Sequence, residues 1–336
     1  MKIGIIGCGA AASAHIRALQ IIPEVREISV MGRNISRVQE YIKPFNGIHI
    51  ARSIDELAAT QDGIVIATPN DTHLSILEEI VSTRTIPVLC EKPLTSTLVN
   101  AEHFVKIAHP LSSINFNYRF NPIISQIMKM TKECRLGNYM FLDFSFNKNS
   151  AITKNKNTWR DNPEQGSGVL SDLGSHLLDL VMYLTKSSID PYSLSVSLGT
   201  RVKTREGIPL LAEDHGVITG ITDKKIMFTL QLSKTSPESL LGIHLRLVFL
   251  HGEIRYSSHH PDQIQLTYVD QVEPQFVQLP QEKRIPDPKN EIPYWSDSFY
   301  WLHKAWIHKL SNLQHGAIAT LAEGLKIQTI ISAIST

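Results

Sequence analysis

The sequence has few cysteines, almost no net charge and no long apolar run, and each shortage excludes a class of protein. Its three cysteines, Cys8, Cys90 and Cys134, lack C-x-x-C spacing, so neither a disulfide framework nor a zinc site is expected. A net charge of +1 without a basic block argues against a nucleic-acid partner, whose binding depends on neutralising phosphates. No apolar run has the length of a transmembrane helix. We therefore expect a soluble cytoplasmic protein without a membrane partner.

The composition is that of a folded chain with a large core. Of 336 residues, 42% are hydrophobic and 19% are charged, so long disordered segments are not expected. The length accommodates two domains of ordinary size. The pattern of apolar residues changes after Arg119, which indicates a first domain over residues 1–119 and a second over residues 120–336.

The stretch KIGIIGCGAAASAHIRAL, residues 2–19, predicts a strand, a tight turn and a helix. The apolar run ends at Gly7, a helical pattern opens at Ala10, and Gly7, Gly9 and Ala12 form G-x-G-x-x-A. In a dinucleotide site the first glycine permits a sharp turn, the second lets the backbone approach a pyrophosphate, and the third small residue allows close helix packing. The pyrophosphate would bind the free N–H groups of the helix N-terminus. The alternative is a purely structural turn.

The residues after the second predicted strand, Ile28–Met31, bear on the cofactor. In a NAD site an Asp or Glu stands about 20 residues beyond the glycine turn, where it binds the ribose 2′-hydroxyl. This sequence has Gly32 at that position and Arg33 beside it. A missing carboxylate leaves room for a 2′-phosphate, which an arginine can bind in bidentate fashion. We expect NADP(H) to be preferred and NAD(H) to be possible; the alternative is a solvated arginine and NAD bound through other contacts.

The rest of the first domain alternates between short apolar runs and helical patterns. This alternation predicts a doubly wound parallel sheet, in which ligands bind beyond the carboxyl ends of the strands. It includes a helix beginning at Thr95 and a last strand over Ile114–Tyr118, and two polar segments, Thr68–His73 and Glu91–Pro93, follow predicted strands. There Lys92 would be held rigidly and partly desolvated, so it could exchange protons or polarise a substrate oxygen. The alternative is an ordinary Glu-Lys surface turn.

The second domain favours antiparallel strands. From Phe141 to Phe146 apolar and polar residues alternate, as in a strand with one buried face, and Leu250–Glu253 has the character of a hairpin turn. The pattern predicts an open, mostly antiparallel sheet with one helical insertion. The other strand candidates are Leu194–Leu198, Gly216–Ile221, Lys225–Leu232, His244–Phe249, Gly252–Tyr256 and Gln263–Tyr268.

The helical insertion carries a carboxylate close to an imidazole. Asp172 and His176 are four residues apart and therefore share one face of the predicted helix. A carboxylate one turn from an imidazole can fix its tautomer and raise its basicity, which suits an acid/base pair. The alternative is an ordinary surface pair. No metal site is expected, because no third ligand has a recognisable spacing.

Several motifs together resemble the Gfo/Idh/MocA oxidoreductases, a family that includes glucose–fructose oxidoreductase and inositol dehydrogenase. These motifs are GIIGCGAAASAH, TPNDTH, EKP, NYRFNP and TWRDNPEQGSGVLSDLGSHLLDL. The resemblance spans essentially the whole chain. It implies a Rossmann domain followed by an α/β domain with an open, mostly antiparallel sheet. It also implies hydride transfer between nicotinamide C4 and a hydroxyl or keto carbon of a sugar, a cyclitol or a nucleotide sugar.

The resemblance also implies roles for individual residues. Lys92 matches the lysine of the E-K-P signature, which contacts the reacting oxygen and assists proton transfer. In the D-x-G-x-H signature His176 matches the general acid/base, and Asp172 binds substrate and orients its neighbours. Tyr118 and Arg119 fall where the chain enters the substrate cleft. The residues expected to bind the cofactor are Gly7, Cys8, Gly9, Ala10, Ala11, Arg33, Asn34, Thr68, Pro69, Asn70, His73, Glu91, Lys92, Asn117, Trp159 and Arg160.

Departures from the family pattern leave other functions open. Gly32 replaces an acid, and Arg119 stands alone where relatives have two arginines. A sensor of NADP(H) or of a sugar that regulates a partner is one alternative, and a nicotinamide-dependent glycosidase is another. Retention of Lys92, Asp172 and His176 together favours the oxidoreductase. A homodimer or homotetramer formed through the second domain's sheet is the expected assembly.

Overall fold

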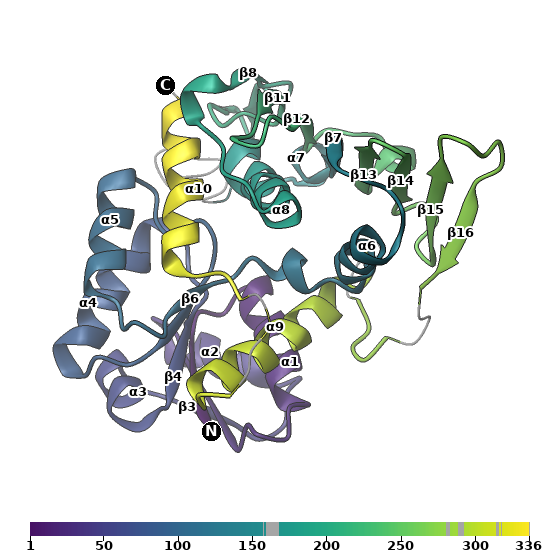
Figure 1. Ribbon diagram of the computed structural model, residues 1–336. Coiled ribbons are helices and arrows are strands. Elements are labelled where there is room, and N and C mark those ends of the chain that lie inside the picture. The colour runs from purple at the N-terminus through teal and green to yellow at the C-terminus, as the bar shows by residue number, and fades with distance from the viewer. Residues whose placement is uncertain are drawn as a thin grey trace. The chain divides into compact units, whose positions relative to one another are not determined.

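The computed structural model describes residues 1–156, 158, 168–279, 283–287, 292–313, 316 and 318–335. The chain divides into two compact units. The first unit comprises residues 1–120 and 296–328, and the second comprises residues 121–295 and 329–336. Figure 1 labels most of the helices and strands of both units.

A parallel sheet forms the centre of the first unit. Its strand order is β3-β2-β1-β4-β5-β6, and neighbouring strands are parallel throughout. The order reverses between β1 and β4, the kind of switch point at which doubly wound sheets bind nucleotides. The predicted Rossmann sheet is therefore confirmed. Its strands are β1 (Lys2–Ile6), β2 (Glu27–Met31), β3 (Ile48–Ile50), β4 (Gly63–Ile66), β5 (Val88–Cys90) and β6 (Ser113–Ile114).

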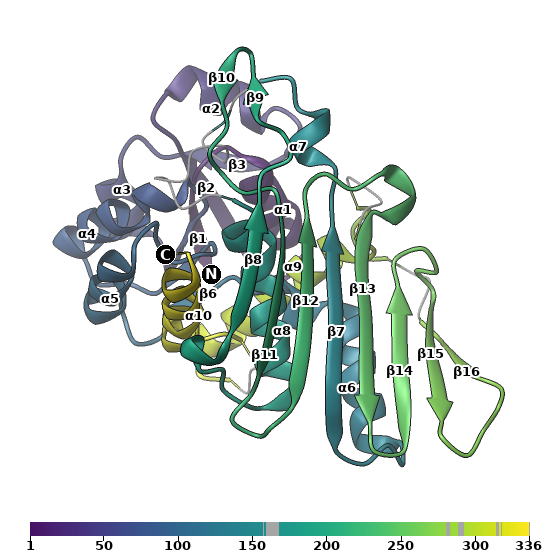
Figure 2. The same cartoon turned by 90° about the horizontal axis from the view of Figure 1, so that it is seen from above.

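Helices cover this sheet on both faces. The consecutive residues Ile64, Val65 and Ile66 of β4 are all fully buried, and because successive side chains of a strand point to opposite faces, both faces are covered. Helices α3, α4 and α5 lie side by side in both views (Figures 1 and 2). The connecting helices are α1 (Ala10–Gln20), α2 (Ile35–Ile42), α3 (Ile54–Thr60), α4 (His73–Thr83) and α5 (Leu98–Ile107).

Two helices from the end of the chain, α9 (Trp295–Leu310) and α10 (Leu321–Ile334), contribute most of their length to the first unit. Trp306 of α9 is fully buried against β4, where a Cβ on Gly63 would lie 3.0 Å from its indole ring. The glycine therefore makes the space that the indole fills. None of the described helices is both long enough and apolar enough to cross a membrane.

One predicted helix in the first unit begins at the wrong residue, and two other elements were not predicted. The helix expected to begin at Thr95 begins at Leu98, because the Thr97 hydroxyl caps it by accepting the Asn100 N–H at 3.3 Å. The Thr95 hydroxyl instead donates to the Thr97 carbonyl at 2.6 Å. Helix α2 and strand β3 occupy segments for which the sequence pattern predicted no element.

The last predicted strand of the first unit, Ile114–Tyr118, is also too long. Strand β6 ends at Ile114, and a 3₁₀ turn follows over Asn117–Phe120. The Asn117 side chain donates to Ser298 of α9 at 2.7 Å, which holds the turn against that helix. Phe116 and Tyr118 are 1% and 3% exposed, so the apolar residues of this segment resembled those of a buried strand.

An open sheet of eight strands forms the second unit (Figure 2). Its order is β16-β15-β14-β13-β7-β12-β11-β8, and every neighbouring pair is antiparallel except β12 and β7. The predicted open, mostly antiparallel sheet is confirmed. Its strands are β7 (Tyr139–Asn147), β8 (Ser195–Gly199), β11 (His215–Ile221), β12 (Met227–Ser233), β13 (Gly242–Phe249), β14 (Gly252–Ser257), β15 (Gln263–Tyr268) and β16 (Gln275–Gln278); β9 (Thr204–Arg205) and β10 (Ile208–Pro209) form a separate ribbon.

One face of this sheet is covered by helices and the other is polar. Along β7, Leu142, Phe144 and Phe146 are buried, while Asp143 and Ser145 point to the opposite face. Helices α6 and α8 lie on the buried face in both views (Figures 1 and 2). The helices of this unit are α6 (Pro122–Glu133), α7 (Ser150–Thr153) and α8 (Ser175–Thr185).

Candidate active site

The glycine turn after β1 has the geometry that a dinucleotide site requires. Gly7 has a φ of +129°, which favours glycine, and a Cβ there would lie 2.2 Å from the Ala67 carbonyl oxygen. The Gly7 N–H also bonds to the Met31 carbonyl at 2.9 Å. By contrast, a Cβ on Gly9 would meet nothing within 4 Å. The turn is therefore packed at Gly7 and open at Gly9, where a phosphate must approach the backbone.

Helix α1 begins directly after this turn, and no side chain caps its N-terminus. Ala10 is exposed and Ala11 is half-buried, whereas Ala12 is fully buried beneath them. The first N–H groups of a helix lack intrahelical partners, and the helix dipole favours an anion beside them. Burial raises the pKa of the Cys8 thiol more than the nearby Arg37 lowers it, so Cys8 adds no negative charge. These residues fit a pyrophosphate.

The structure gives Gly32 a packing role in addition to the one expected. A Cβ at this position would lie 2.9 Å from a methyl carbon of Val38 and 3.0 Å from the sulfur of Cys8. Both distances are shorter than ordinary contacts. Position 32 therefore lacks the carboxylate expected in a NAD site, and it also has little space for any side chain.

Helix α2 contributes two residues that the sequence analysis missed, Arg37 and Tyr41. The Asn34 side chain caps this helix by accepting the Arg37 N–H at 3.0 Å. Arg33 and Arg37 are both exposed, and the charge of Arg37 acts on the thiol in the glycine turn. The Tyr41 hydroxyl donates to the Gly9 carbonyl at 2.8 Å, which fixes the turn. The four-residue spacing of the arginines was visible in the sequence, whereas the Tyr41 contact had no local signal.

The segment after β4 is held in place by its own hydrogen bonds. The Thr72 hydroxyl lies 2.7 Å from the Pro69 carbonyl oxygen and 2.8 Å from the Thr68 hydroxyl. Thr68 and Pro69 are half-buried, and Asn70 is buried. The first two therefore remain at the carboxyl end of β4, where the sequence analysis places the cofactor.

His73 supports this segment from inside the protein. Its ring is fully buried, with Nε2 3.0 Å from the Thr68 carbonyl oxygen and Nδ1 2.9 Å from the Leu94 carbonyl oxygen. Burial lowers the pKa of His73, and a neutral ring can donate to only one of these carbonyls at a time. His73 thus connects the segments after β4 and β5, and a ring without exposed surface can influence a cofactor only through them.

The E-K-P segment follows β5. Lys92 is half-buried, and the Lys92–Pro93 peptide bond is cis. The Glu91 carboxylate is turned inward: its Oε1 accepts from Asn115 Nδ2 at 2.6 Å and lies 2.9 Å from His15 Nε2. Because β1 and β5 flank β4 in a parallel sheet, Lys92 and the glycine turn lie at the same edge of the sheet.

Three predicted residues after β6 make contacts within the first unit. Asn117 is buried and bonded to α9, and Tyr118 is 3% exposed. The side chain of Arg119 is 4% exposed and lies 2.8 Å from Glu323 of α10. The substrate role expected for Arg119 stays a prediction, and it would require this ion pair to open.

In the second unit, Asp172 and His176 lie on successive turns of one helical segment. Residues Leu170–Gly174 form a π-turn that leads into α8, whereas the sequence predicted a regular helix. Such turns are frequent at functional sites. The Asp172 side chain is 24% exposed, and the buried His176 ring lies 6.4 Å from the Phe146 ring of β7.

Asp172 has a partner that the sequence analysis missed. Lys234, directly after β12, is 7% exposed and places its Nζ 3.5 Å from Asp172 Oδ2. Glu213 lies nearby: its carboxylate accepts the Leu170 N–H at 3.1 Å, and burial raises its pKa. The pairing of β12 with β7 brings Lys234 to this helix. No local pattern of residues in the sequence predicts that pairing.

The structure groups the predicted residues in two sets. The cofactor residues and Lys92 belong to the first unit, and Asp172 and His176 belong to the second. Trp159 and Arg160 lie outside the described residues. Within the described part of the chain, no group of three or more His, Cys, Asp or Glu side chains could hold a metal ion.

A Rossmann sheet with an open glycine turn, joined to an open-sheet unit with an Asp-His helix, defines the class of nicotinamide-dependent oxidoreductases. A family model described as "Oxidoreductase family, NAD-binding Rossmann fold" matches residues 1–116, and the GFO/IDH/MocA C-terminal domain model matches residues 124–255. The chain therefore belongs to the Gfo/Idh/MocA oxidoreductase family, as its motifs indicated.

Individual relatives agree with this assignment. Glucose-6-phosphate 3-dehydrogenase of Bacillus subtilis is 32% identical over 335 residues, 98% of this chain and 94% of the relative. The NADP(+)-dependent scyllo-inositol 2-dehydrogenase IolW of the same organism is 26% identical over 55% of this chain and 51% of its own length. Among solved structures, levoglucosan dehydrogenase in complex with NADH and levoglucosan has a TM-score of 0.86 at 18% identity, over 100% of this chain and 96% of that one; this likeness shows the shared fold.

Proposed function

We propose that the protein is an NAD(P)-dependent dehydrogenase or reductase that transfers a hydride between nicotinamide C4 and a hydroxyl or keto carbon of a sugar-like substrate. The observation that carries the proposal is the sheet edge shared by the open glycine turn and Lys92. Nucleotide and cation would meet there, as hydride transfer to or from an alcohol carbon requires. Family membership and the sugar dehydrogenases among the relatives support it.

The side chains of this chain would handle charge and protons during the reaction. A bound nicotinamide supplies the hydride acceptor or donor. The Lys92 ammonium would stabilise negative charge on the reacting oxygen, an effect worth about 3 kcal/mol for comparable donors. His176 would accept the hydroxyl proton in oxidation and return it in reduction, which contributes on the order of 10²–10⁴-fold. Asp172 would bind a substrate hydroxyl beside it.

The names of the relatives support a substrate class. One relative is a scyllo-inositol 2-dehydrogenase, and another, which covers nearly the whole chain, is a glucose-6-phosphate 3-dehydrogenase. We therefore add hexose phosphates to the candidate substrates, which already include the sugars, cyclitols and nucleotide sugars expected from the motifs. The experiment is a stopped-flow screen of these alcohols and their keto forms against NADP⁺, NADPH, NAD⁺ and NADH, with Lys92→Met and His176→Asn as controls. If both variants turn over at the parent's rate, the proposed roles are wrong.

For the nucleotide we propose that NADP(H) is preferred through Arg33 and Arg37, which are exposed at the beginning of α2. Changing either residue to Gln is expected to raise the KM for NADP⁺ about tenfold, since a hydrogen bond to a charged group is worth about 1.5 kcal/mol or more. The KM for NAD⁺ should stay nearly constant. Arg52→Gln, another exposed arginine of the same unit, is the matched control. Equal effects on both nucleotides would remove the 2′-phosphate argument. Gly32→Asp is a poor test, because its Cβ would press on Val38.

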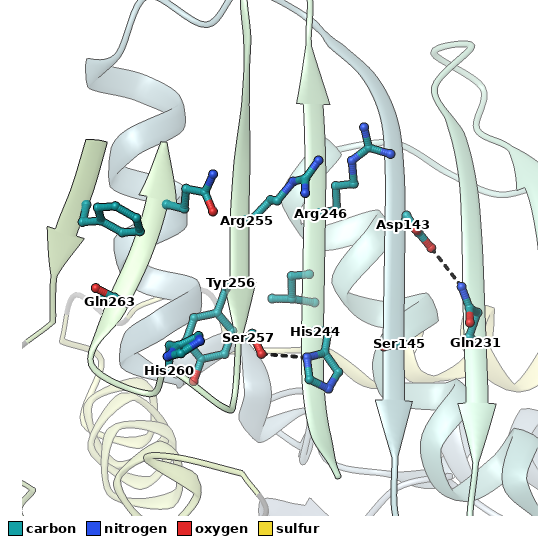
Figure 3. Close-up of a pocket in the computed structure, with 13 residues that line it drawn as sticks. Asp143, Ser145, Gln231, His244, Arg246, Arg255, Tyr256, Ser257, His260 and Gln263 are labelled. Atoms are coloured by element: carbon teal, nitrogen blue, oxygen red, sulfur yellow. Dashed lines mark hydrogen bonds between the residues drawn. The ribbon is translucent and has the colours of Figure 1, made fainter. Parts of the chain in front are cut away.

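We also propose a homodimer or homotetramer formed through the polar face of the second unit's sheet. Figure 3 shows the hollow on this face, about 310 Å³ in volume, with the Arg246 and Arg255 side chains along one side. Both arginines bond to the same carboxylate, Glu253, which balances one of their two positive charges. Sedimentation of the parent and of Ser145→Arg, which would fill the hollow, tests the idea. A parent that sediments as a monomer contradicts it.

A further inference from the structure

In the first unit, buried polar side chains form a hydrogen-bonded series that begins at Glu91, the residue before Lys92. His15 of α1 and His303 of α9 are fully buried, and the Glu91 side chain is 13% exposed. His15 Nε2 lies 2.9 Å from Glu91 Oε1, and His15 Nδ1 lies 2.7 Å from His303 Nε2. Buried polar groups cost free energy unless they are bonded, so this arrangement is specific and its members are interdependent.

Asn115 and the Lys92 backbone complete the surroundings of the Glu91 carboxylate. Asn115 Nδ2 donates to Oε1 at 2.6 Å, and the Lys92 N–H donates to Oε2 at 3.3 Å. With His15, these bonds reach the carboxylate from α1, from the segment after β6 and from its own loop. A carboxylate that accepts several N–H bonds is favoured in its ionised form.

The charge on Glu91 acts on Lys92. Burial raises the pKa of the Glu91 carboxyl, but the bonds from His15 and Asn115 and the charge of Lys92 outweigh burial, so the pKa lies below its ordinary value. An attraction between two charges acts equally on both. The ionised carboxylate therefore favours the ammonium form of Lys92.

The histidines do not form a path for protons out of the protein. An ionised carboxylate can only accept, so His15 Nε2 carries a hydrogen. Burial and the neighbouring His15 hold the pKa of His303 well below its ordinary value, so His303 is neutral. Its remaining nitrogen, Nδ1, is buried and has no hydrogen-bond partner among the described residues. The series of hydrogen-bonded side chains therefore ends at His303, and its effect is to stabilise the charge on Glu91.

Two other titratable groups face Glu91, and both are neutral. His73 of α4 is fully buried, which lowers its pKa. The Cys90 thiol of β5 has a pKa well above its ordinary value, because of burial and then of Glu91 itself. The charge of Lys92 also acts on Glu91.

We propose that Glu91 holds Lys92 in place as a fixed cation, and that His15 and Asn115, backed by His303, are positioning residues for Glu91. Lys92 then acts on the substrate oxygen through its charge, and the proton is left to another group. The inference rests on the proposed function only for what Lys92 does to substrate; the support of Lys92 by Glu91 can be tested without any turnover.

The test reads the titration of Lys92 directly. The full-length protein is reductively methylated with ¹³C-formaldehyde, and the dimethyl-lysine signal of Lys92 is assigned by its loss in Lys92→Arg and followed against pH by NMR. In Glu91→Gln the titration midpoint of Lys92 is expected to fall by roughly 1 unit, the lower end of the effect of an adjacent opposite charge. Glu323→Gln, which removes another ion-paired carboxylate of the same unit, should leave the midpoint unchanged.

The positioning role is tested by a pair of variants at His15. His15→Phe removes both ring nitrogens and should lower the Lys92 midpoint, whereas His15→Gln keeps an N–H donor and should restore most of it. An unchanged Lys92 midpoint in Glu91→Gln overturns the inference. If Glu91→Gln does not fold, equal midpoints in the parent, His15→Phe and His15→Gln overturn it instead. Absence of sugar turnover would count against the proposed function and leave these titrations intact.

Discussion

Each unit pairs a lysine with a carboxylate, but the two units bury opposite partners. In the first, the inward-turned carboxylate of Glu91 supports the half-buried Lys92. In the second, Lys234 is 7% exposed and supports Asp172, which is 24% exposed. A buried charge needs a partner, so the sign of the buried group sets the sign of the group beside it. The first unit thereby presents a cation and the second an anion.

The two supports also differ in how they are built. The Glu91 carboxylate is held by hydrogen bonds of 2.6 and 2.9 Å from Asn115 and His15, and Lys234 Nζ lies 3.5 Å from Asp172 Oδ2. A short hydrogen bond fixes a position more tightly than a contact of 3.5 Å. We expect loss of Lys234, which supports a charge, to cost less activity than loss of Lys92, which is itself the charge presented to the substrate.

The largest effect is expected from Lys92→Met. The variant keeps the length of the side chain but removes the charge at the reacting oxygen, so kcat should fall about 10²–10³-fold, as after loss of an oxyanion donor. The Kd of NADPH, measured by its fluorescence, should change only a few-fold. A variant that loses nucleotide affinity and keeps kcat would make Lys92 a binding residue and break the comparison.

A smaller effect is expected from Lys234→Met. Without its buried cation, Asp172 is protonated more easily, so the acid limb of the pH–rate profile should move to higher pH by about one unit. Near-parent rates should return at alkaline pH. Lys203→Met, at an exposed lysine of the same unit, provides the control. A uniform loss of rate at every pH would indicate damage to the fold.

The smallest effect is on the free energy of unfolding. It distinguishes the first unit, where histidines support Glu91, from the second, where Lys234 supports Asp172. Burial keeps His303 neutral, with a pKa well below the ordinary 6.5, while the unfolded chain binds a proton near 6.5. Stability is therefore complete above that pH and falls as the pH drops toward the folded pKa, by up to about 1.4 kcal/mol per pH unit. Urea unfolding of His303→Leu between pH 7 and pH 5 should show a shallower slope than the parent. Equal slopes would mean that the folded ring is charged.

Local patterns in the sequence were sufficient for most strands of both sheets, although not for β3 or β16. The small residues at Gly7, Gly9 and Ala12 predicted the turn and helix, and the alternation along β7 predicted a strand with one buried face. Both signals lie within one stretch of chain. The segment after Ile114 was misassigned because its side chains are bound by α9, whose sequence lies far downstream.

The supports of the site could not be predicted for the same reason. His15 meets His303 across 288 positions of sequence, and Lys234 reaches Asp172 only because β12 pairs with β7. Sequence spacing identifies the groups at strand ends and on one helix face. It does not show which distant side chain neutralises or holds them.

The central claim is that Lys92 and His176 serve one reaction step, and a double-mutant cycle tests it most directly. Single-turnover hydride transfer is measured for Lys92→Met, His176→Asn and the double variant. Residues that act as a unit give losses that do not multiply, so the double variant should be no more than a few-fold slower than the slower single variant. Losses that multiply in full would show that the two side chains act independently and would contradict the claim.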